Sequence, residues 1–450
     1  KLPHIMQNFM ISCFNYFSYR KRYGGVYLSY RKIFKKNSTL ALHELQNIQK
    51  SKFADFIKYA IENSHYYKTK LEGFHEVSNI SHLEQLPILS KEDLRNNFDQ
   101  ILTIDGKDGI ISKTGGTTGK SLKVIFTYED MQERFAMIDN FREQYGYKLG
   151  KRTAWFSGKS LITKKDIEKN RFWKTDKFYN VRYYSTFHVN KNYLRHYLVD
   201  LLKYKPKYIV GFPSTISEIA RYGIENRFDF PKNVVKAIFP TAETLTSEIK
   251  HLLESYFKCG VYDQYASSEG APFIFECSMG NLHLELQSGV FEVLNDNNKN
   301  SLEGRLIVTS FTTHGTPLIR YDIGDRVKLA NIGCSCGNNN PIVENILGRE
   351  DDFIYSPQNG KINLGNISNT LKGVFGIKKF QVIQDYLDSI IIQIVVDKNI
   401  FSINDEKKFL SNWVDRVGES MTIKLKTVEG ISVEKSGKFR LVKNNIKHLI

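Results

Sequence analysis

Residues 208–239 read YIVGFPSTISEIARYGIENRFDFPKNVVKAIF, and this stretch decides the fold. An apolar run at Tyr208 to Phe212 precedes a helical pattern over Thr215 to Asn226 and a second apolar run at Val234 to Phe239. Strand, helix and strand in this order predict parallel strands joined by a helical crossover. The alternation continues outward, with strands at Thr153 to Phe156 and Val261 to Tyr265 and helices at Leu42 to Asn63, Tyr128 to Tyr145, Asn192 to Lys203 and Ser247 to Phe257. We therefore predict an α/β core.

The chain beyond this core changes pattern twice. Residues 289–330 alternate strand patterns with turn clusters, which indicates an antiparallel or barrel-like subdomain. A smaller unit follows, with strands near Lys379 to Gln384, Ile390 to Val396 and Thr422 to Thr427 and a helix near Asp405 to Val417. The prediction is a large multi-layer α/β domain over residues 1–347 and a small, mobile α+β domain over residues 348–450.

Composition narrows the class of protein. The 450 residues carry 64 Lys and Arg against 48 Asp and Glu, a net charge of +16, and 41% of them are hydrophobic, which excludes a largely disordered chain. No apolar run approaches the roughly 20 residues of a membrane span. Five cysteines are too few for a disulfide scaffold. Because the start of the sequence shows no signal-peptide pattern, we expect a cytoplasmic protein.

The surplus charge is concentrated in residues 1–40, which contain eight basic side chains and no Asp or Glu. Nine aromatic residues are interleaved with them. This composition suits the anionic inner face of a membrane, where each Lys or Arg contributes about 1 kcal/mol. It also suits a helical lid whose aromatic side chains pack on the main domain. Nucleic acid would attract the same charges, but no sequence-reading motif accompanies them, so we expect no nucleic-acid partner.

A loop rich in glycine and hydroxyl groups carries the first chemical signal. It reads Ser112-Lys113-Thr114-Gly115-Gly116-Thr117-Thr118-Gly119-Lys120-Ser121. Glycine lets a backbone approach a phosphate chain, hydroxyls donate to its oxygens, and lysine neutralises its charge. A Walker loop is excluded, since it needs glycine at position 114 and a helix afterwards, whereas Leu122 to Phe126 favours a strand. The alternative is an ordinary surface loop.

Four further segments follow this loop in order. They are Gln264-Tyr265-Ala266-Ser267-Ser268-Glu269, Tyr321-Asp322-Ile323-Gly324-Asp325, Gly348-Arg349-Glu350-Asp351-Asp352 and Lys435-Ser436-Gly437-Lys438-Phe439-Arg440. Together the five segments resemble the ordered motifs of the acyl-adenylate-forming superfamily. The segments at Leu86 to Lys91, Pro206 to Ser214 and Pro240 to Thr246 resemble its phenylacetate–CoA ligase-like group. Residues 183–188 and the basic start are most similar to members associated with capsular and other surface polysaccharides.

The resemblance implies a role for each matched residue in binding ATP and Mg²⁺. Thr114, Thr117, Thr118 and Lys120, with Gly115, Gly116 and Gly119, would hold the β- and γ-phosphates. Glu269 would ligate Mg²⁺, Ser268 would contact the α-phosphate, and Asp325, assisted by Arg349, would bind the ribose. Thr241, Ala242, Glu243 and Tyr265 would line the nucleotide. Lys438 would be the catalytic cation, brought in by a small domain that rotates about Asp351. For the acidic residues the alternative is a surface ion pair.

Four side chains form a separate candidate metal site. Cys277 and His283 are followed some fifty residues later by Cys334 and Cys336. Three thiolates and one imidazole make a tetrahedral Zn²⁺ set, and pairs from two loops are a usual way to build one. The Cys-x-Cys spacing is tighter than the common two-residue gap. Reduced cysteines in a turn are therefore the alternative to a structural zinc.

The resemblance places the substrate pocket near Trp155, His188 and Phe212. The function that it implies is ATP-dependent activation of a carboxylate as acyl-AMP, with transfer to an amine or to a thiol such as that of CoA, in surface polysaccharide biosynthesis. The substrate would be a small or glycan-linked carboxylate. The alternatives are a phenylacetate-type aryl-CoA ligase and a non-catalytic, membrane-associated scaffold. The protein would be cytoplasmic, with peripheral association at the inner face of the membrane.

Overall fold

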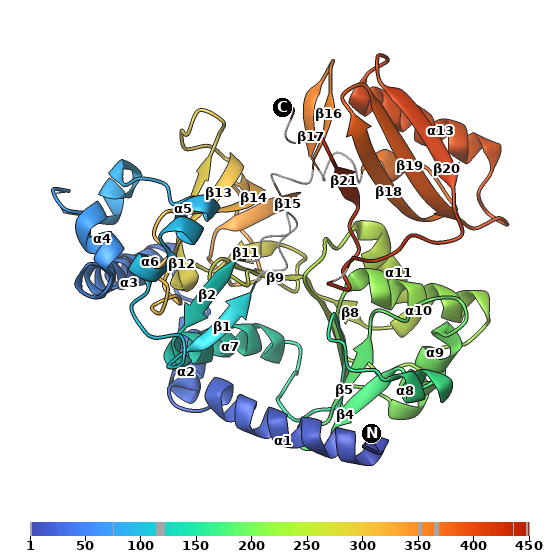
Figure 1. The fold of residues 1–450 in the computed structure, drawn as a ribbon, viewed down its shortest axis with the longest axis horizontal. Helices are drawn as coiled ribbons and strands as arrows, with labels where there is room; N and C mark the ends of the chain where they lie inside the picture. The colour runs from blue at the N-terminus through green and yellow to red at the C-terminus, as the bar shows by residue number, and fades with distance from the viewer. Residues whose placement is uncertain are drawn as a thin grey trace. The chain divides into compact units, whose positions relative to one another are not determined.

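The computed structural model describes residues 2–74, 76–113, 122–349, 353–363, 369–434, 436–446 and 449. They form two compact units (Figure 1). Unit 1 comprises Lys1–Glu292, Ile307–Ile323 and Ala330–Val343, and unit 2 comprises Val293–Leu306, Gly324–Leu329 and Glu344–Ile450. The predicted domain boundary between residues 347 and 348 stays a prediction. Within the described residues, no helix is both long and apolar enough to cross a membrane.

A six-stranded sheet forms the centre of unit 1, in the order β4-β5-β3-β6-β7-β8. All neighbours are parallel except the edge strand β4, which is antiparallel to β5. The predicted α/β class is therefore confirmed. The strands are β3 (Thr153–Ser157), β4 (Trp173–Asp176), β5 (Val181–Ser185), β6 (Tyr208–Gly211), β7 (Ala237–Pro240) and β8 (Gly260–Val261).

Helices cover both faces of this sheet. Since successive side chains of a strand point to opposite faces, neighbouring residues of one strand enter different cores. Ile209 packs into a core with residues of α9 (Leu194–Tyr204), α10 (Pro213–Glu225) and α11 (Ser247–Phe257). The next residue, Val210, packs into a second core with residues of α2 (Tyr27–Asn37) and α7 (Tyr128–Glu143). Burial on both faces explains why the central strands β6 and β7 contain no charged residue and are buried along their whole length.

The rest of unit 1 surrounds this sheet. β1 (Ile110–Lys113) and β2 (Lys123–Phe126) form a hairpin, and β9 (Gln264–Ala266), β10 (Phe273–Glu276) and β11 (Leu282–Leu284) are antiparallel neighbours in a second sheet. The remaining helices are α1 (His4–Tyr23), α3 (Leu42–Asn63), α4 (His65–Lys70), α5 (Lys91–Asn96), α6 (Phe98–Ile101), α8 (Lys164–Glu168) and the 3-10 helices η1 (Ile80–Gln85) and η2 (Leu286–Ser288).

Unit 2 contains a four-stranded sheet in the order β20-β19-β18-β21. Helix α13 (Ile403–Val417) packs on it through the buried Phe409 and Trp413. Its strands are β18 (Ile377–Tyr386), β19 (Ser389–Val396), β20 (Thr422–Thr427) and β21 (Val442–Asn444), and a hairpin of β16 (Phe353–Ser356) and β17 (Gly360–Asn363) and the 3-10 helix η3 (Asn369–Leu371) complete the unit.

Four strands contribute residues to both units. They are β12 (Gly289–Leu294), β13 (Glu303–Ser310), β14 (Tyr321–Ala330) and β15 (Ile342–Arg349). The strands predicted over residues 289–330 are present, whereas the barrel-like arrangement stays a prediction.

One predicted strand is wrong. The sequence predicts a single strand from Val261 to Tyr265, but β8 ends at Val261 in the parallel sheet and β9 begins at Gln264 in the antiparallel one. The chain passes between the two sheets at Tyr262 and Asp263. A short apolar run shows that both ends are buried, but it does not show that their hydrogen-bonding partners differ.

Candidate functional site

The carboxyl ends of the parallel strands lie at one edge of the central sheet. Phe156, Gly211 and Pro240 are aligned across β3, β6 and β7. Gly211 has a φ of +152°, and a Cβ atom there would lie 2.2 Å from the Phe156 carbonyl oxygen. The close approach of β3 and β6 therefore requires glycine. In open α/β sheets, ligands bind beyond this edge.

The predicted nucleotide-lining turn lies at the same edge. The Thr241 amide donates to the Gly211 carbonyl at 3.0 Å, and Ala242 has a left-handed φ of +67°. Glu243 Oε2 accepts a hydrogen bond of 3.1 Å from the Ser214 amide in the first turn of α10. An acceptor at a helix amino terminus satisfies an otherwise unpaired amide. Glu243 thus ties the turn to α10.

The three predicted substrate residues have different surroundings. His188 Nδ1 lies 2.8 Å from Ser185 Oγ, just beyond the end of β5, and burial lowers the pKa of its imidazole. Phe212 is buried at the start of α10. Trp155 lies within β3 and packs in the α7 layer, with the Arg142 guanidinium 5.7 Å from its ring. Their contact with a substrate stays a prediction.

A second group of residues surrounds Glu269, which follows β9 and is buried. The Tyr321 hydroxyl donates a hydrogen bond of 2.6 Å to Glu269 Oε2. Ser112 Oγ donates at 3.0 Å to the carbonyl of Ser268, a residue whose side chain is exposed. Unit 1 therefore brings together residues of three predicted motifs. Tyr265 lies half-buried in β9, paired with Ile274.

Arg134 of α7 fixes the loop that carries Glu269. Its guanidinium donates to the Ser267 carbonyl at 2.6 Å and to the Gly270 carbonyl, and it lies between the rings of Phe126 and Phe273. Burial lowers the pKa of Arg134 to about 10, against the opposing effect of nearby acidic groups. Sequence analysis missed this residue because it lies among charged residues typical of an exposed helix face.

The segment that includes Leu89 holds the backbone on both sides of Tyr321. The Leu89 amide donates to the Arg320 carbonyl at 2.9 Å, and the Asp322 amide donates to the Leu89 carbonyl at 3.0 Å. Arg320 pairs with Glu292 at 2.9 Å and donates to the Glu84 carbonyl at 2.7 Å. The Leu86 to Lys91 motif thus pairs with the strand that presents Tyr321.

The four predicted metal ligands come together in unit 1. The ligand atoms of Cys277, His283, Cys334 and Cys336 all lie within 4.8 Å of one another. Cys277 Sγ is 3.7 Å from Cys334 Sγ, and Cys336 Sγ is 3.4 Å from His283 Nε2. Bonds of about 2.0–2.3 Å from one tetrahedral ion produce ligand separations of this size.

Neighbouring groups orient these ligands. His283 Nδ1 lies 3.0 Å from the Asn340 carbonyl oxygen, so a proton on Nδ1 leaves Nε2 free to face the sulfur atoms. Burial opposes ionisation of Cys334, but hydrogen bonds from the Cys336 backbone and the Asn281 side chain outweigh it and lower the pKa of Cys334 to about 6. The donor set fits zinc.

The other predicted residues lie in unit 2 or outside the described residues. Asp325 is half-buried in β14, and Arg349 ends β15. Lys438 lies in a turn closed by a 2.9 Å hydrogen bond from the Glu434 amide to its carbonyl. The predicted phosphate-binding residues Thr114, Gly115, Gly116, Thr117, Thr118, Gly119 and Lys120 and the predicted hinge residue Asp351 all fall outside the described residues.

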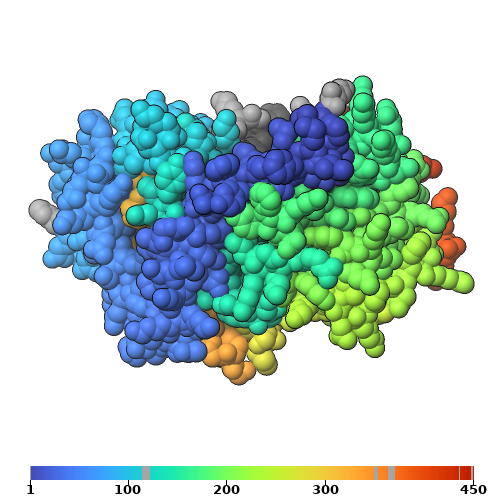
Figure 2. Space-filling model, turned by 90° about the horizontal axis from the view of Figure 1, so that it is seen from below, coloured from blue at the N-terminus to red at the C-terminus, as the bar shows by residue number. Residues whose placement is uncertain are grey.

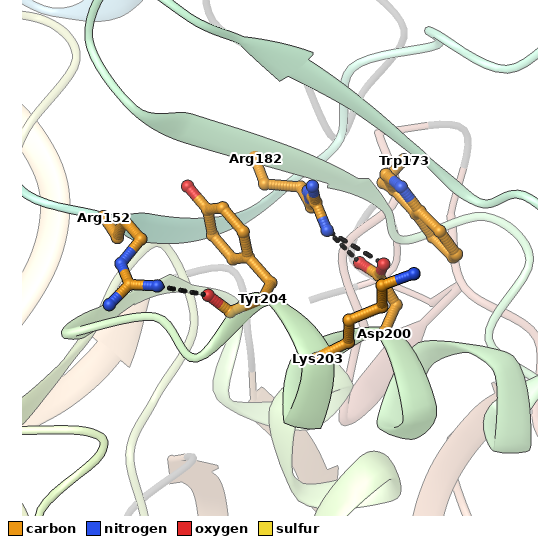
Figure 3. A pocket seen from close by; sticks show the side chains of 6 residues that line it. All are labelled: Arg152, Trp173, Arg182, Asp200, Lys203 and Tyr204. Atoms are coloured by element: carbon orange, nitrogen blue, oxygen red, sulfur yellow. Dashed lines mark hydrogen bonds and ion pairs between the residues drawn. The ribbon is translucent and has the colours of Figure 1, made fainter.

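A pocket of about 450 Å³ lies near the opposite, amino-terminal edge of the central sheet (Figure 3). Nη1 of Arg182 donates to both carboxylate oxygens of Asp200, at 2.8 and 2.9 Å, and the guanidinium lies over the Tyr204 ring, 4.1 Å from its centre. Among the predicted site residues that the structure describes, none lines this pocket, whose other lining residues are Arg152, Trp173 and Lys203.

Comparison with known proteins identifies the family. The family model for the CapK C-terminal domain matches residues 354–445. Protein CapK of Staphylococcus aureus is 34% identical over 455 residues, covering 99% of this chain and 98% of the relative. The chain belongs to the CapK family.

Solved structures resemble this CapK-family chain in fold. A 2-hydroxyisobutyryl-CoA ligase in complex with 2-HIB-AMP, in its postadenylation state, has a TM-score of 0.74 at 17% identity over 92% of each chain. The GH3.15 acyl acid amido synthetase has a TM-score of 0.60 at 14% identity, over 93% of this chain and 94% of its own. The predicted resemblance to acyl-adenylate-forming enzymes is confirmed at the level of the fold.

Proposed function

We propose that this CapK-family protein is an ATP-dependent adenylate-forming ligase. It activates a carboxylate as acyl-AMP and transfers the acyl group to an amine or a thiol, in the biosynthesis of a surface polysaccharide such as a capsule. The observation that carries the proposal is the Tyr321–Glu269 hydrogen bond. It joins two of the predicted motifs in a fold whose solved relatives include an acyl-AMP complex. Full-length similarity to CapK supports the pathway.

The chemistry requires the carboxylate oxygen to attack the α-phosphorus of ATP while pyrophosphate leaves. Catalysis then consists of positioning the reactants and neutralising charge. In this proposal Glu269 ligates Mg²⁺, which would neutralise phosphate charge, and Ser268 contacts the α-phosphate. Lys438 bridges the carboxylate and the α-phosphate. The ribose is bound by Asp325 and Arg349, the phosphates by residues 114–120, and the base by Thr241, Ala242 and Tyr265.

Glu243 has a positioning role in this account. Its carboxylate accepts from the Ser214 amide, so it holds the 241–243 turn against α10. In the second half-reaction the acceptor attacks the acyl carbonyl and AMP leaves. Rotation of the small domain about Asp351 would withdraw Lys438 and admit that acceptor.

The acceptor is either a thiol such as CoA or an amine. The similar folds include a CoA ligase and an amido synthetase, so the fold accommodates both chemistries. A phenylacetate-type aryl-CoA ligase is the alternative. The two are separated by whether CoA accelerates release of AMP from the preformed adenylate.

The Cys277, His283, Cys334 and Cys336 cluster would hold a structural zinc ion. All four donors are soft or borderline ligands that Zn²⁺ prefers, and a site with four protein ligands has no open position for catalysis. The metal would therefore join the two loops and take no part in the reaction.

The protein would act in the cytoplasm, in peripheral association with the inner face of the membrane.

ATP–pyrophosphate exchange across aryl acids, amino acids, short hydroxy acids and uronic acids tests the proposal. Exchange that depends on one class of acid would support adenylation and name the substrate class. Silence across the panel together with failure to bind ATP would contradict it. If ATP binds but no acid of the panel supports exchange, the same assay is applied to nucleotide- or lipid-linked carboxylates. Absence of exchange with those substrates would also contradict the proposal.

A further inference from the structure

Helix α1 packs with its polar face inward. Asn8, Ser12, Asn15 and Tyr19 are each at most 7% exposed, and their spacing of four, three and four residues places them on one stripe. A surface helix ordinarily buries its apolar stripe instead. In the α1 segment the large apolar side chains point to solvent, with exposed fractions of 46–73%: Leu2, Ile5, Met6, Phe9, Met10, Phe14 and Phe17.

Hydrogen bonds to the edge of the central sheet fix this orientation. Asn8 Oδ1 accepts from the Thr175 amide at 3.1 Å, and Ser12 Oγ accepts from the Lys177 amide at 2.9 Å. Asn15 Nδ2 donates to Asp176 Oδ2 at 2.8 Å. Asn8 and Ser12 thus satisfy backbone amides at and just beyond the edge strand β4, along which α1 lies in Figure 1. The helix is therefore held with its apolar side toward solvent.

The exposed apolar surface extends beyond the helix. Phe178, which follows β4, is 51% exposed, and its ring lies 6.5 Å from that of Phe9 and 6.2 Å from that of Tyr16. We call Phe178 and the seven apolar residues of the α1 segment the α1 outer face. Figure 2 shows the amino-terminal residues, in dark blue, at the molecular surface. A contiguous apolar surface of this kind marks an interaction site.

The amino-terminal segment that carries the α1 outer face also exposes cationic side chains, and the Arg20 guanidinium lies 4.6 Å from the Tyr16 ring. Arg20 and Lys21 are exposed in the last turns of α1, and Lys32, Lys35 and Lys36 are exposed on α2. Residues 1–43 contain no Asp or Glu. A segment that exposes both apolar and basic side chains suits an anionic bilayer, which takes up the apolar side chains and attracts the basic ones. A second copy of this chain would instead bring two cationic surfaces together.

We propose that the α1 outer face inserts into the surface of a bilayer that contains anionic phospholipid. Helix α1 then lies in the plane of the membrane, with its polar stripe bound to β4. This inference does not rest on the proposed ligase activity. The helical-lid interpretation, in which the aromatic side chains pack on the main domain, fits Tyr19 but not Phe14 and Phe17, which are 71% and 65% exposed.

Vesicle co-sedimentation of the full chain tests the inference. The probes are phosphatidylcholine vesicles with and without about one third phosphatidylglycerol. We expect binding to the anionic vesicles and a reduction of at least about tenfold in the triple variant Phe9→Ser, Phe14→Ser, Phe17→Ser, since each buried apolar group contributes to membrane affinity. The matched control is Ile224→Ser, Phe375→Ser, Ile400→Ser, which removes three side chains of 52%, 68% and 58% exposure elsewhere and should bind normally.

Charge and oligomeric state complete the test. A further triple variant removes three charges of α2: Lys32→Gln, Lys35→Gln, Lys36→Gln. It should bind anionic vesicles more weakly, and the binding that it retains should depend less on salt concentration. Unchanged melting temperature in the Phe variant would show that α1 stays docked. Absence of wild-type binding, or equal binding by the Phe variant, would overturn the inference. So would a lipid-free dimer that the Phe variant converts to a monomer, because the occupant would then be a second copy.

Discussion

The Tyr321 hydroxyl lies 2.6 Å from Oε2 of Glu269, 52 residues earlier in the chain. Burial, and then the adjacent Glu269 charge, raise the pKa of Tyr321 well above its ordinary value, so the phenol stays protonated and donates. Arg134 holds the loop before and after Glu269, and the Leu89 backbone holds the strand of Tyr321. The carboxylate is therefore fixed from two directions, as the proposed metal-binding role of Glu269 requires.

Tyr321→Phe removes the donor and leaves the buried carboxylate of Glu269 with one partner fewer. A hydrogen bond to a charged group contributes about 1.5–3 kcal/mol, so we expect a loss of stability of that order. Misplacement of the carboxylate should also lower ATP–pyrophosphate exchange by at least about tenfold.

The matched control for this variant is Tyr184→Phe. The Tyr184 hydroxyl donates to Asp200 Oδ2 at 2.7 Å and is equally buried, but it lies beside the pocket at the opposite edge of the sheet. We expect a similar loss in the free energy of unfolding with exchange unchanged. Equal losses of exchange in both variants would remove the specific role of Tyr321.

Arg134→Lys tests whether the buried guanidinium positions Glu269. Lysine keeps the charge but cannot donate to the Ser267 and Gly270 carbonyls in the same fork. We expect a lower rate of exchange with a raised requirement for Mg²⁺, measured by titrating the metal. A variant that loses thermal stability but keeps its Mg²⁺ dependence would show that Arg134 acts on folding alone.

The Cys277, His283, Cys334 and Cys336 cluster should contain one zinc ion per chain by elemental analysis of protein purified without chelator. Cys336→Ser should lower the zinc content several-fold and lower the melting temperature, because a structural metal contributes folding energy. Cys259→Ser is the control, since Cys259 lies outside the cluster and burial raises the pKa of its thiol to about 12. Wild-type protein without zinc would exclude the assignment.

His314 makes stability depend on pH. Its Nδ1 lies 2.6 Å from the buried Asp130 Oδ1; burial lowers the imidazole pKa, but the hydrogen bond and charge of Asp130 outweigh it and raise that pKa overall. A raised pKa means that the folded state binds the proton more tightly, so this stability is fully present below about pH 6.5 and is lost as pH rises through the folded-state pKa.

The comparison of wild type with His314→Gln isolates this effect. The wild-type advantage in melting temperature should be largest near pH 5.5 and should shrink by pH 8.5, in melts recorded across that range. Other titrating groups are common to both proteins and largely cancel. A constant difference across the range would show that the Asp130–His314 pair does not titrate as described.

The sequence predicted the elements whose burial follows the ordinary apolar pattern. Helix α3 has its predicted bounds, since Leu45, Phe53 and Phe56 form the buried stripe. A helical lid was one interpretation of residues 1–40, but the bounds of α1 were not predicted. Its buried stripe contains Asn8, Ser12 and Asn15, so the apolar residues mark the exposed face of this helix and not the buried one. Strand β21 was missed because three residues are too short to show a period.

The candidate site was predictable where residue type and spacing alone indicate the chemistry. The four metal ligands were found from residue type and spacing, and the structure brings them together. Arg134 and the Glu243–Ser214 contact were not found, because their roles depend on partners brought close only by the fold. The contribution of the phosphate loop and of Lys438 stays a prediction.

Formation of acyl-AMP in a single turnover tests the central claim most directly. Wild-type protein would be mixed with ATP, Mg²⁺ and the acid that supports exchange, and the products would be identified by mass spectrometry. The account predicts equal amounts of acyl-AMP and pyrophosphate, with formation reduced by orders of magnitude in Lys438→Ala although ATP still binds. Near-normal formation in Lys438→Ala would contradict the role of that lysine, and ADP with phosphate in place of acyl-AMP would contradict adenylation itself.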